Sequence, residues 1–480
     1  MPSFRSLRAK YVGNKAFYAA VLALIVPIII QNTISNFVNL LDNLMVGAVG
    51  EGQMNGVSVS NTLMFVFNLA VFGGMSGATI FGAQFYGAGD EDGMRNSFRF
   101  SLLVGGFVCL LGLIVFGFFR EPLLKLWINP VTTGTEEELL LEKQKAADTL
   151  EAGLAYLRVM LFGLVPFALT NAYAGMLRVN GESRLPMYAS IASVATNLCL
   201  NYVLIFGHLG FPALGVTGAA IATVIARYVE LSIILIVTYR RVRLRDQYGF
   251  LRHAWRHFRI PGALFRNILI KSLPLLLNEV MWSAGMSVLS RQYSLRGLTV
   301  VNAMTITSTL TNLFNVFFIS MGTASSVFVG RSLGANDPEG AKDNARKIIA
   351  FEEFICVCTG LMLIIASPWL PLVYTKSSLA AKHLASTLIR VSALILPLQG
   401  FSHCTYFTLR AGGKTFVTFL FDSVYTWLLP VPMAFLLVRL TDLYVVAIYA
   451  IVNGMEIIKD VFGYILLKKG VWIQNIVSDP

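Results

Sequence analysis

The sequence predicts an all-α polytopic membrane protein with twelve transmembrane helices in two homologous six-helix bundles. Of its 480 residues, 56% are hydrophobic and only 13% are charged, and the mean hydropathy is +0.67. A soluble domain of average composition is far less apolar than this. Apolar windows of about 20 residues, the length that spans a bilayer, recur along the whole chain. An internal repeat relates the first half of the chain to the second.

The apolar windows give the positions of the predicted spans. In the first half they cover residues 17–41, 58–82, 98–119, 154–176, 186–206 and 214–238. In the second half they cover residues 268–290, 301–330, 346–370, 388–409, 415–437 and 441–467. An even number of spans returns the chain to the side where it began. We therefore expect both termini on one side of the membrane.

Basic residues indicate which side this is. Lysine and arginine gather in the two termini and in every second connection, above all in the loop 239–267. Cytoplasmic loops carry such an excess of positive charge. We therefore predict a multi-pass protein of the cell (inner) membrane with cytoplasmic N- and C-termini.

The repeat is seen in short matching motifs. Pro274 in LPLLLNE follows Pro27 in VPIIIQN by 247 positions, and Gly334 in GANDPEG follows Gly87 in GAGDEDG by the same 247. Further along, LRAGG follows LRVNG by 232 positions, and the shortfall of 15 matches an acidic insert, TGTEEELLLEKQKAADTLE, present only in the first half. Two parallel repeats with a substrate cavity between them are a known transporter architecture.

This repeat divides the chain into domains. We predict an N-terminal six-helix lobe at 1–238, a basic cytoplasmic linker at 239–267 and a C-terminal six-helix lobe at 268–480.

The net charge of +12 does not indicate a nucleic-acid partner, because the basic residues sit in loops between spans. Anionic lipid headgroups are the expected partner of such loops. The cysteines lack ligand spacing and lie in apolar stretches, so we expect neither disulfides nor a metal cluster. These are Cys109, Cys199, Cys356, Cys358 and Cys404. The chain has no GxxxxGK[ST] motif and no paired-histidine signature, so ATP-driven pumping and metallohydrolase chemistry have no support and we do not expect an enzyme.

A polar stripe marks the first span. Gln31, Ser35, Asn39 and Asp42 fall within an arc of about 80° on a helix. A charged side chain near the bilayer centre costs ~2.5–3.5 kcal/mol on insertion scales, so Asp42 should face a bundle interior or an aqueous cavity. Two interpretations follow: a carboxylate that binds a proton or cation, which we favour, or an interfacial charge near the outer end of the span.

The fifth span carries a second stripe. Ser190, Ser193, Asn197 and Asn201 lie within an arc of about 80°, and Thr223 follows in the segment GVTGAAIAT. Their oxygens could complete a shell for Na⁺ around a carboxylate from another helix. They could equally join helices by hydrogen bonds.

The second half contains its own buried acids. Glu279 lies beside Asn278 and just past Pro274, where a proline frees a backbone carbonyl within the membrane. It is either a functional carboxylate or one paired for packing. Asp422 is a further buried acid with no partner evident from the sequence. Trp282 is placed to line a cavity, where aromatic faces attract cations.

The chain resembles the multidrug and toxic compound extrusion (MATE) family of the MOP superfamily. The motifs VNLLDNLMVGAVG, GAGD, LRVNGESRLPMY, NLCLNYVLIFG and GVTGAAIAT carry the likeness, which covers essentially the full chain and is nearest to NorM- and DinF-like bacterial members. The resemblance implies export of amphipathic, often cationic, compounds in exchange for inward Na⁺ or H⁺ by alternating access.

The resemblance also implies residue roles. Asp42 matches the family's N-lobe cation-site carboxylate, Asn197 matches its fifth-helix asparagine, and Thr223 matches its sixth-helix threonine. Asn201 stands where many members have aspartate, which removes one negative charge. Glu279 resembles the seventh-helix glutamate of the NorM-like branch. The tenth-helix aspartate of that branch has no counterpart here, where Gln399 and His403 lie near its place.

We therefore interpret the chain as a monomeric secondary antiporter for small amphipathic or cationic molecules, without a cofactor other than Na⁺ or H⁺ as coupling ion. The predicted coupling-ion or proton site consists of Asp42, Asn197, Asn201 and Thr223, and Na⁺ at Asp42 is the one metal considered. The predicted substrate or second acidic site consists of Glu279, Gln31, Asn39, Asn278, Trp282 and Asp422. A flippase for lipid-linked oligosaccharides is the alternative within the superfamily, but it should need a more cationic cavity. A channel or a receptor is disfavoured by the repeat and the buried acids.

Overall fold

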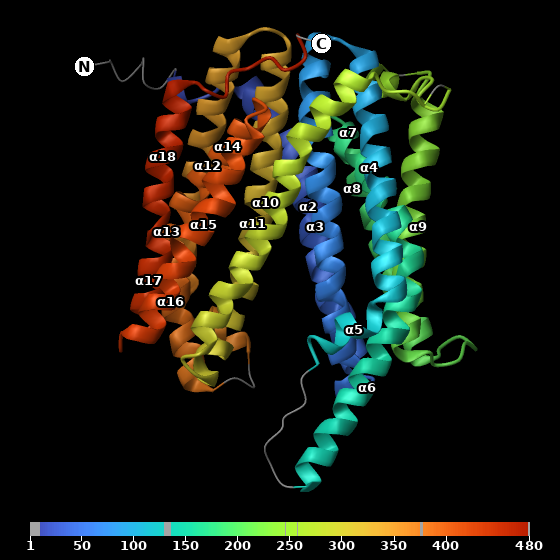
Figure 1. Cartoon of the computed structure of the whole chain (residues 1–480), viewed down its shortest axis with the longest axis vertical. Helices are drawn as coiled ribbons and strands as arrows, with labels where there is room; N and C mark the ends of the chain where they lie inside the picture. The colour runs from blue at the N-terminus through green and yellow to red at the C-terminus, as the bar shows by residue number, and fades with distance from the viewer. Residues whose placement is uncertain (1–9, 129–135, 245, 257, 375–377, 479–480) are drawn as a thin grey trace. The chain divides into compact units, whose positions relative to one another are not determined.

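The computed structural model describes residues 10–128, 136–244, 246–256, 258–374 and 378–478, and these residues form helices and connecting turns without a β-strand (Figure 1). The first half contains α2 (Lys15–Gly47), α3 (Glu51–Ala88), α4 (Glu91–Phe118), α5 (Arg120–Lys125), α6 (Glu136–Met160), η1 (Leu161–Gly163), α7 (Leu164–Val179), α8 (Arg184–Phe206), α9 (Gly215–Arg241) and η2 (Asp246–Leu251). The second half contains α10 (Gly262–Ser294), α11 (Leu298–Gly334), α12 (Pro338–Ala366), η3 (Leu370–Val373), α13 (Leu379–Ala411), α14 (Thr415–Phe419), η4 (Leu420–Val424), α15 (Tyr425–Leu428), α16 (Pro430–Leu440), α17 (Val445–Gly454) and α18 (Glu456–Lys469).

Every predicted span falls on a helix or on helices joined end to end, which confirms the all-α membrane fold. Within the described residues, ten stretches are long and apolar enough to cross a membrane. The other two predicted spans, 268–290 and 441–467, correspond to α10 and to α17 with α18. Both regions carry charged and amide side chains within the apolar sequence, and these lower their mean hydropathy.

The chain divides into two compact units. The C-terminal unit comprises Met1–Ile29, Ser76–Met94 and Pro261–Pro480, and the N-terminal unit comprises Ile30–Met75 and Arg95–Ile260. Both α2 and α3 therefore contribute one part to each unit.

The loops GAGD and GAND adopt the same conformation, which shows the repeat in three dimensions. Gly89 has φ +72° and Asn336, its counterpart 247 positions on, has φ +55°. The next residue in each loop caps a helix: the carboxylates of Asp90 and Asp337 accept a hydrogen bond from the backbone N–H three positions later, at 2.9 and 2.8 Å. Glycine and asparagine are the residues that tolerate this left-handed region best.

Two repeat-related glycines bring α3 and α11 into backbone contact within the C-terminal unit. A Cβ placed on Gly87 would lie 1.9 Å from the carbonyl oxygen of Arg331, and one on Gly334 would lie 1.8 Å from that of Gln84. Gln84 and Arg331 are themselves 247 positions apart. The crossing is therefore symmetric, and only glycine permits it.

The motifs LRVNG and LRAGG also end their helices alike. Gly181 and Gly413 have φ +82° and +74°, and their N–H groups donate to the carbonyl oxygens of Arg178 and Arg410, both at 2.9 Å. Arg410 is only 3% exposed. By the count of basic residues, Arg178 and Arg410 belong to cytoplasmic connections; in the structure they lie in the last turns of α7 and α13.

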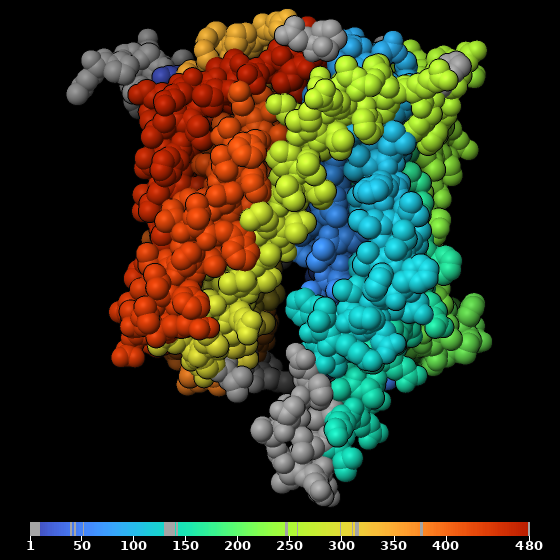
Figure 2. Space-filling view, viewed as in Figure 1, coloured from blue at the N-terminus to red at the C-terminus, as the bar shows by residue number. Residues whose placement is uncertain are grey.

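Helix α13 is the central helix of the C-terminal unit, with α11, α12 and α18 packed against it. Almost all residues in its last three turns are buried. In contrast, α18 lies at the surface of this unit in Figure 2 (red), and apart from the two lysines of its last turn its exposed side chains are apolar. They include Ile457, Val461, Phe462 and Tyr464. Apolar exposure outside and polar groups inside are what a bilayer requires.

Candidate functional site

Asp42 lies at the centre of a polar group in the N-terminal unit. The Asn201 amide Nδ2 donates to Asp42 Oδ1 at 2.5 Å, and it lies 3.2 Å from Asn197 Oδ1. Asn197 and Asn201 are four residues apart on α8, so both amides project from one face of that helix. They are 5% and 0% exposed. The predicted stripe on α8 therefore meets the predicted stripe on α2.

The Asn197 amide fits its surroundings in two orientations. In one, its Nδ2 donates to Thr223 Oγ1 at 3.2 Å and its oxygen accepts from Asn201. In the other, its Nδ2 donates to Asp42 Oδ1 at 3.0 Å and Oδ2 at 3.2 Å, and its oxygen accepts from Thr223 at 3.2 Å. An ionised carboxylate only accepts hydrogen bonds, whereas a protonated one also donates. The second orientation therefore suits ionised Asp42, and the first suits protonated Asp42, whose proton faces the Asn197 oxygen.

One oxygen at this site has no hydrogen-bond partner among the described residues. It is Asn201 Oδ1, which is buried. A buried acceptor of this kind usually binds water or an ion. Together with the Asp42 carboxylate it offers oxygen ligands of the type that Na⁺ or a hydrated proton would use.

Gln31 lies apart from this group. Its Oε1 accepts a hydrogen bond from Arg178 Nη2 at 2.9 Å, which joins α2 to the end of α7. The Arg178 charge also interacts with Glu230 of α9. The side chain of Asn39, predicted for the second site, lies outside the described residues.

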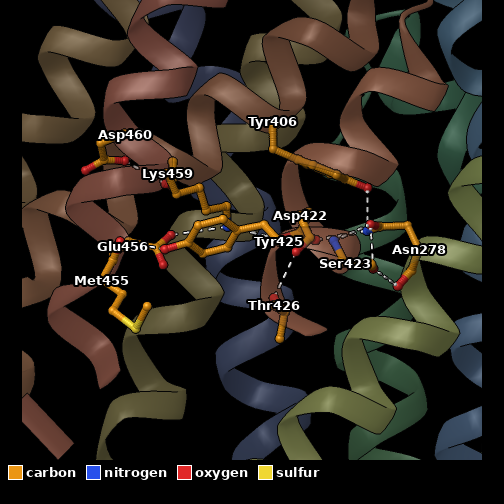
Figure 3. A network of polar contacts seen from close by, with 11 residues as sticks. Asn278, Tyr406, Asp422, Ser423, Tyr425, Thr426, Met455, Glu456, Lys459 and Asp460 are labelled. Carbon is orange, nitrogen blue, oxygen red and sulfur yellow. Dashed lines mark hydrogen bonds and ion pairs between the residues drawn. The ribbon is translucent and has the colours of Figure 1, made fainter. Parts of the chain in front are cut away.

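Asn278 belongs to a second polar network, in the C-terminal unit (Figure 3). Its Nδ2 donates to Asp422 Oδ2 at 3.0 Å and to Tyr406 Oη at 3.2 Å. Ser423 Oγ donates to the Asn278 side-chain and backbone oxygens at 2.7 and 2.8 Å. Asn278 is only 2% exposed, and these bonds use both ends of its amide. The network joins α10, α13 and η4.

Asp422 has a lysine partner that the sequence did not indicate. Lys459 Nζ lies 3.0 Å from Asp422 Oδ1 and 3.2 Å from Glu456 Oε1, so α18 supplies both a cation and a further acid. Asp422 sits in η4, a π-helical turn within an otherwise α-helical segment. Such turns are frequent at functional sites.

Glu279, the neighbour of Asn278 on α10, also interacts with Tyr406. Its carboxylate is within hydrogen-bonding range of the Tyr406 hydroxyl, and its charge interacts with those of Arg410 and Asp422. The structure thus brings Asn278, Glu279 and Asp422 together around Tyr406. Trp282, one turn further along α10, is 37% exposed, and the described network does not include its indole. The nearby Trp427 indole donates to the Met281 carbonyl at 2.9 Å.

Sequence reasoning missed several members of this network. A lysine and a glutamate three residues apart within the apolar window 441–467 were a usable signal, because intramembrane ionisable residues usually pair with one another. Tyr406 gave no signal of its own, since its role depends on contacts from three helices.

Comparison with known proteins extends this description. A family model described as MatE matches residues 27–203 and 274–436. The uncharacterized transporter YisQ of Bacillus subtilis is 22% identical and aligns over 98% of each chain. Probable multidrug resistance proteins NorM of Thermotoga maritima and Agrobacterium fabrum are 22% and 27% identical, over 95% and 82% of this chain and 93% and 81% of theirs.

Solved structures share the fold at low identity. A multidrug resistance MATE family transporter in an outward-facing conformation superposes with a TM-score of 0.79 at 19% identity, covering 98% of this chain and 99% of the other. A MOP superfamily transporter from Pyrococcus furiosus, described as having a binding pocket of reverse polarity, gives 0.79 at 20% identity over the same shares. The match extends along both repeats.

Proposed function

Because the chain belongs to the MatE family, whose members are membrane transporters rather than enzymes, we propose that it is a secondary active antiporter. It exports amphipathic or cationic small molecules across the cell membrane in exchange for Na⁺ or H⁺. The names of the NorM relatives, which are multidrug resistance proteins, support this substrate class. The flippase alternative has no support among these relatives.

The observation that carries the proposal is the contact between Asp42 and the two α8 amides. Asn201 donates to Asp42 at 2.5 Å, and Asn197 can either donate to the same carboxylate or accept from it. A carboxylate with such adaptable neighbours can be stabilised in both its charged and its neutral form. That is the property a coupling site needs, because it must load and release its ion in every cycle.

The mechanism follows from the charge on Asp42. A proton or Na⁺ arriving from outside neutralises the carboxylate and reverses the Asn197 amide, which changes the contact between α2 and α8. Pro27 lies inside α2, and a proline interrupts helix hydrogen bonding where a helix can bend. The ion drives export only through different affinities for the two conformations.

We further propose how the chain is organised in the membrane. Residues 1–238 and 268–480 form the two lobes, 239–267 form the cytoplasmic linker, both termini are cytoplasmic, and the protein acts as a monomer. The C-terminal acid Glu279, with Asn278 and Asp422, serves as the second acidic position that contacts substrate or ion. The exposed apolar surface of α18 supports contact with lipid.

The test is efflux of a panel of cationic and neutral compounds from proteoliposomes, with Na⁺ and pH gradients imposed separately. We expect one gradient to drive efflux by the wild type, and Asp42→Asn to abolish it. The matched control is Glu121→Gln, an exposed acid that pairs with Lys125 at 2.6 Å, which should transport normally. Undiminished efflux by both Asp42→Asn and Glu279→Gln would refute the assignment.

A further inference from the structure

Three carboxylates of the C-terminal unit lie near one another on α12 and α18, away from the network around Asn278. They belong to Glu352, Glu353 and Asp460. A Cβ placed on Gly400 of α13 would lie 3.5 Å from Glu353 Oε1 and 3.6 Å from Glu352 Cγ, so the glycine leaves room for both glutamates. The charges of Glu353 and Asp460 are close enough to interact.

Glu352 is the most unusual of the three. It is 0% exposed, and neither carboxylate oxygen accepts a hydrogen bond from the described residues. The groups that interact with it include the thiols of Cys356 and Cys404, and a thiol is a weak donor. An ionised carboxylate buried without a partner is strongly destabilising, so the group takes up a proton instead.

Glu353 and Asp460 also have few hydrogen-bond partners. Ser402 Oγ donates to Asp460 Oδ1 at 2.6 Å, whereas Glu353 Oε1 is buried without a hydrogen bond. Two carboxylates whose charges interact and that have a single hydroxyl donor cannot both remain ionised at low cost, and one proton on Glu353 removes the repulsion.

The surrounding charged and titratable groups do not neutralise these acids. Around the three acids, the neighbouring groups are Cys356 of α12, His403 and Cys404 of α13, and Glu456 and Lys459 of α18. Lys459 is the nearest cation, but its ammonium contacts Asp422 and Glu456. His403 Nε2 is buried and has no hydrogen bond in the described part of the chain.

The ligand that fits is a proton rather than a metal ion. Across the described residues, no three histidine, cysteine, aspartate or glutamate side chains are placed so that they could ligate a metal together. We propose that Glu352, Glu353 and Asp460 form a proton-binding site inside the C-terminal unit, in which Glu352 holds one proton and the charge of Asp460 keeps a second proton on Glu353. Because the Ser402 hydroxyl donates to Asp460 and stabilises its ionised form, the second proton resides on Glu353. On release, each proton passes to water and leaves a carboxylate.

This site is distinct from Asp42 and from Glu279. In the antiporter it adds a proton to each transport cycle, and that role rests on the proposed function. Binding of the protons does not depend on transport. Two measurements therefore test proton binding and its role in transport separately.

The first measurement is infrared spectroscopy of the purified full-length protein in lipid nanodiscs, titrated with pH. We expect a carbonyl-stretch band of a protonated carboxylic acid at neutral pH that Glu352→Gln removes, and a titrating component that Glu353→Gln and Asp460→Asn each remove. Glu339→Gln is the control, because Glu339 lies on the same helix with a side chain 78% exposed. Asp42→Asn identifies any contribution from the N-terminal unit.

The substitutions are nearly isosteric, and monodisperse elution with a normal circular dichroism spectrum establishes folding. If Glu352→Gln fails to fold, the bands of Glu353→Gln and Asp460→Asn decide whether the site binds protons. Bands unchanged in every variant that folds would overturn the site.

The second measurement counts the protons moved per substrate in proteoliposomes. We expect Glu353→Gln and Asp460→Asn to keep transporting while about one proton fewer moves per substrate. An unchanged count in a folded variant would overturn the coupling role. If the wild type transports nothing, the proposed function fails, whereas the infrared bands still decide whether the site binds protons.

Discussion

Lys459 Nζ lies 3.0 Å from Asp422 Oδ1, and this ion pair joins α18 to the π-helical turn η4. Both side chains are largely buried, at 11% and 16% exposure. The ring of Phe421 also lies 5.3 Å from the ammonium, which adds a cation–π contact. In a membrane protein such a pair holds two helices in a fixed register, because neither charge can be left alone in an apolar interior.

We predict that breaking this pair destabilises the protein. Lys459→Met leaves Asp422 and Glu456 buried without a cation, and removal of one partner from a buried pair costs about 3–5 kcal/mol. The measurement is thermal unfolding in detergent, where Lys459→Met should lower the Tm.

The double variant Lys459→Met/Asp422→Asn provides the control for this first prediction. Because the uncompensated charge at Asp422 is gone, it should be more stable than Lys459→Met alone. Losses that simply add would show that the two side chains are not coupled.

Close packing at the repeat glycines leads to the second prediction. Gly87→Ala and Gly334→Ala each place a methyl group within 2 Å of a backbone carbonyl oxygen, so α3 and α11 must move apart. Overpacking of this kind costs about 1–3 kcal/mol. We expect a lower Tm in both variants, and similar losses, since the crossing is symmetric.

The matched control for the glycines is Gly117→Ala. A Cβ at Gly117 meets nothing within 4 Å, so this variant should unfold like the wild type. If the three variants unfold at the same temperature, the close crossing is not present in the protein.

The third prediction concerns Asn201, the amide nearest to Asp42. Asn201→Asp places a second carboxylate 2.5 Å from the first, and two carboxylates at this distance require a bound cation or a shared proton. We expect the variant to bind Na⁺ more tightly than the wild type, measured by isothermal titration calorimetry at constant pH. The double variant Asp42→Asn/Asn201→Asp has a single carboxylate, and its Na⁺ affinity should not exceed that of the wild type. Equal Na⁺ affinity in all three proteins would contradict the assignment of these residues to one site.

The sequence predicted the contacts of Asp42 better than those of Asp422, for a physical reason. Asp42, Asn197 and Asn201 each belong to a polar stripe that helical periodicity makes visible, and a polar stripe in the membrane must meet another. Asp422 and Lys459 come from different helices with no such stripe, so their pairing depends on the tertiary fold. The π-helical turn that aims Asp422 cannot be seen in the spacing of residues.

The arginines show a second limit of sequence reasoning. Arg178 and Arg410 lie next to turns, where a charge count places them at the membrane surface. The structure gives Arg178 a hydrogen bond to Gln31 and buries Arg410 beside Tyr406. Both arginines occupy the same place in the repeated motifs LRVNG and LRAGG, which a count of charges in loops does not take into account.

The last prediction concerns the C-terminal segment, which Gln84 holds within the C-terminal unit. Gln84 Nε2 donates to the carbonyl oxygens of Ala411 and Gln474 at 2.9 and 3.1 Å, and its Oε1 accepts from Ile476 N–H at 2.8 Å. Gln84 is fully buried, and Trp472 is only 2% exposed. Gln84→Ala removes all three hydrogen bonds, and the loss of a partner for the buried Ala411 carbonyl alone costs about 1–3 kcal/mol.

The segment should then detach more often, which exposes the chain after Lys468 and Lys469 to trypsin. Cleavage there, followed by mass spectrometry, should be faster in Gln84→Ala than in the wild type, because proteolysis follows the population of the opened form. Gln144→Ala, a change at an exposed residue of α6, controls for general effects of losing an amide. Equal cleavage rates in all three proteins would mean that the segment is held by Trp472 and its apolar neighbours rather than by Gln84.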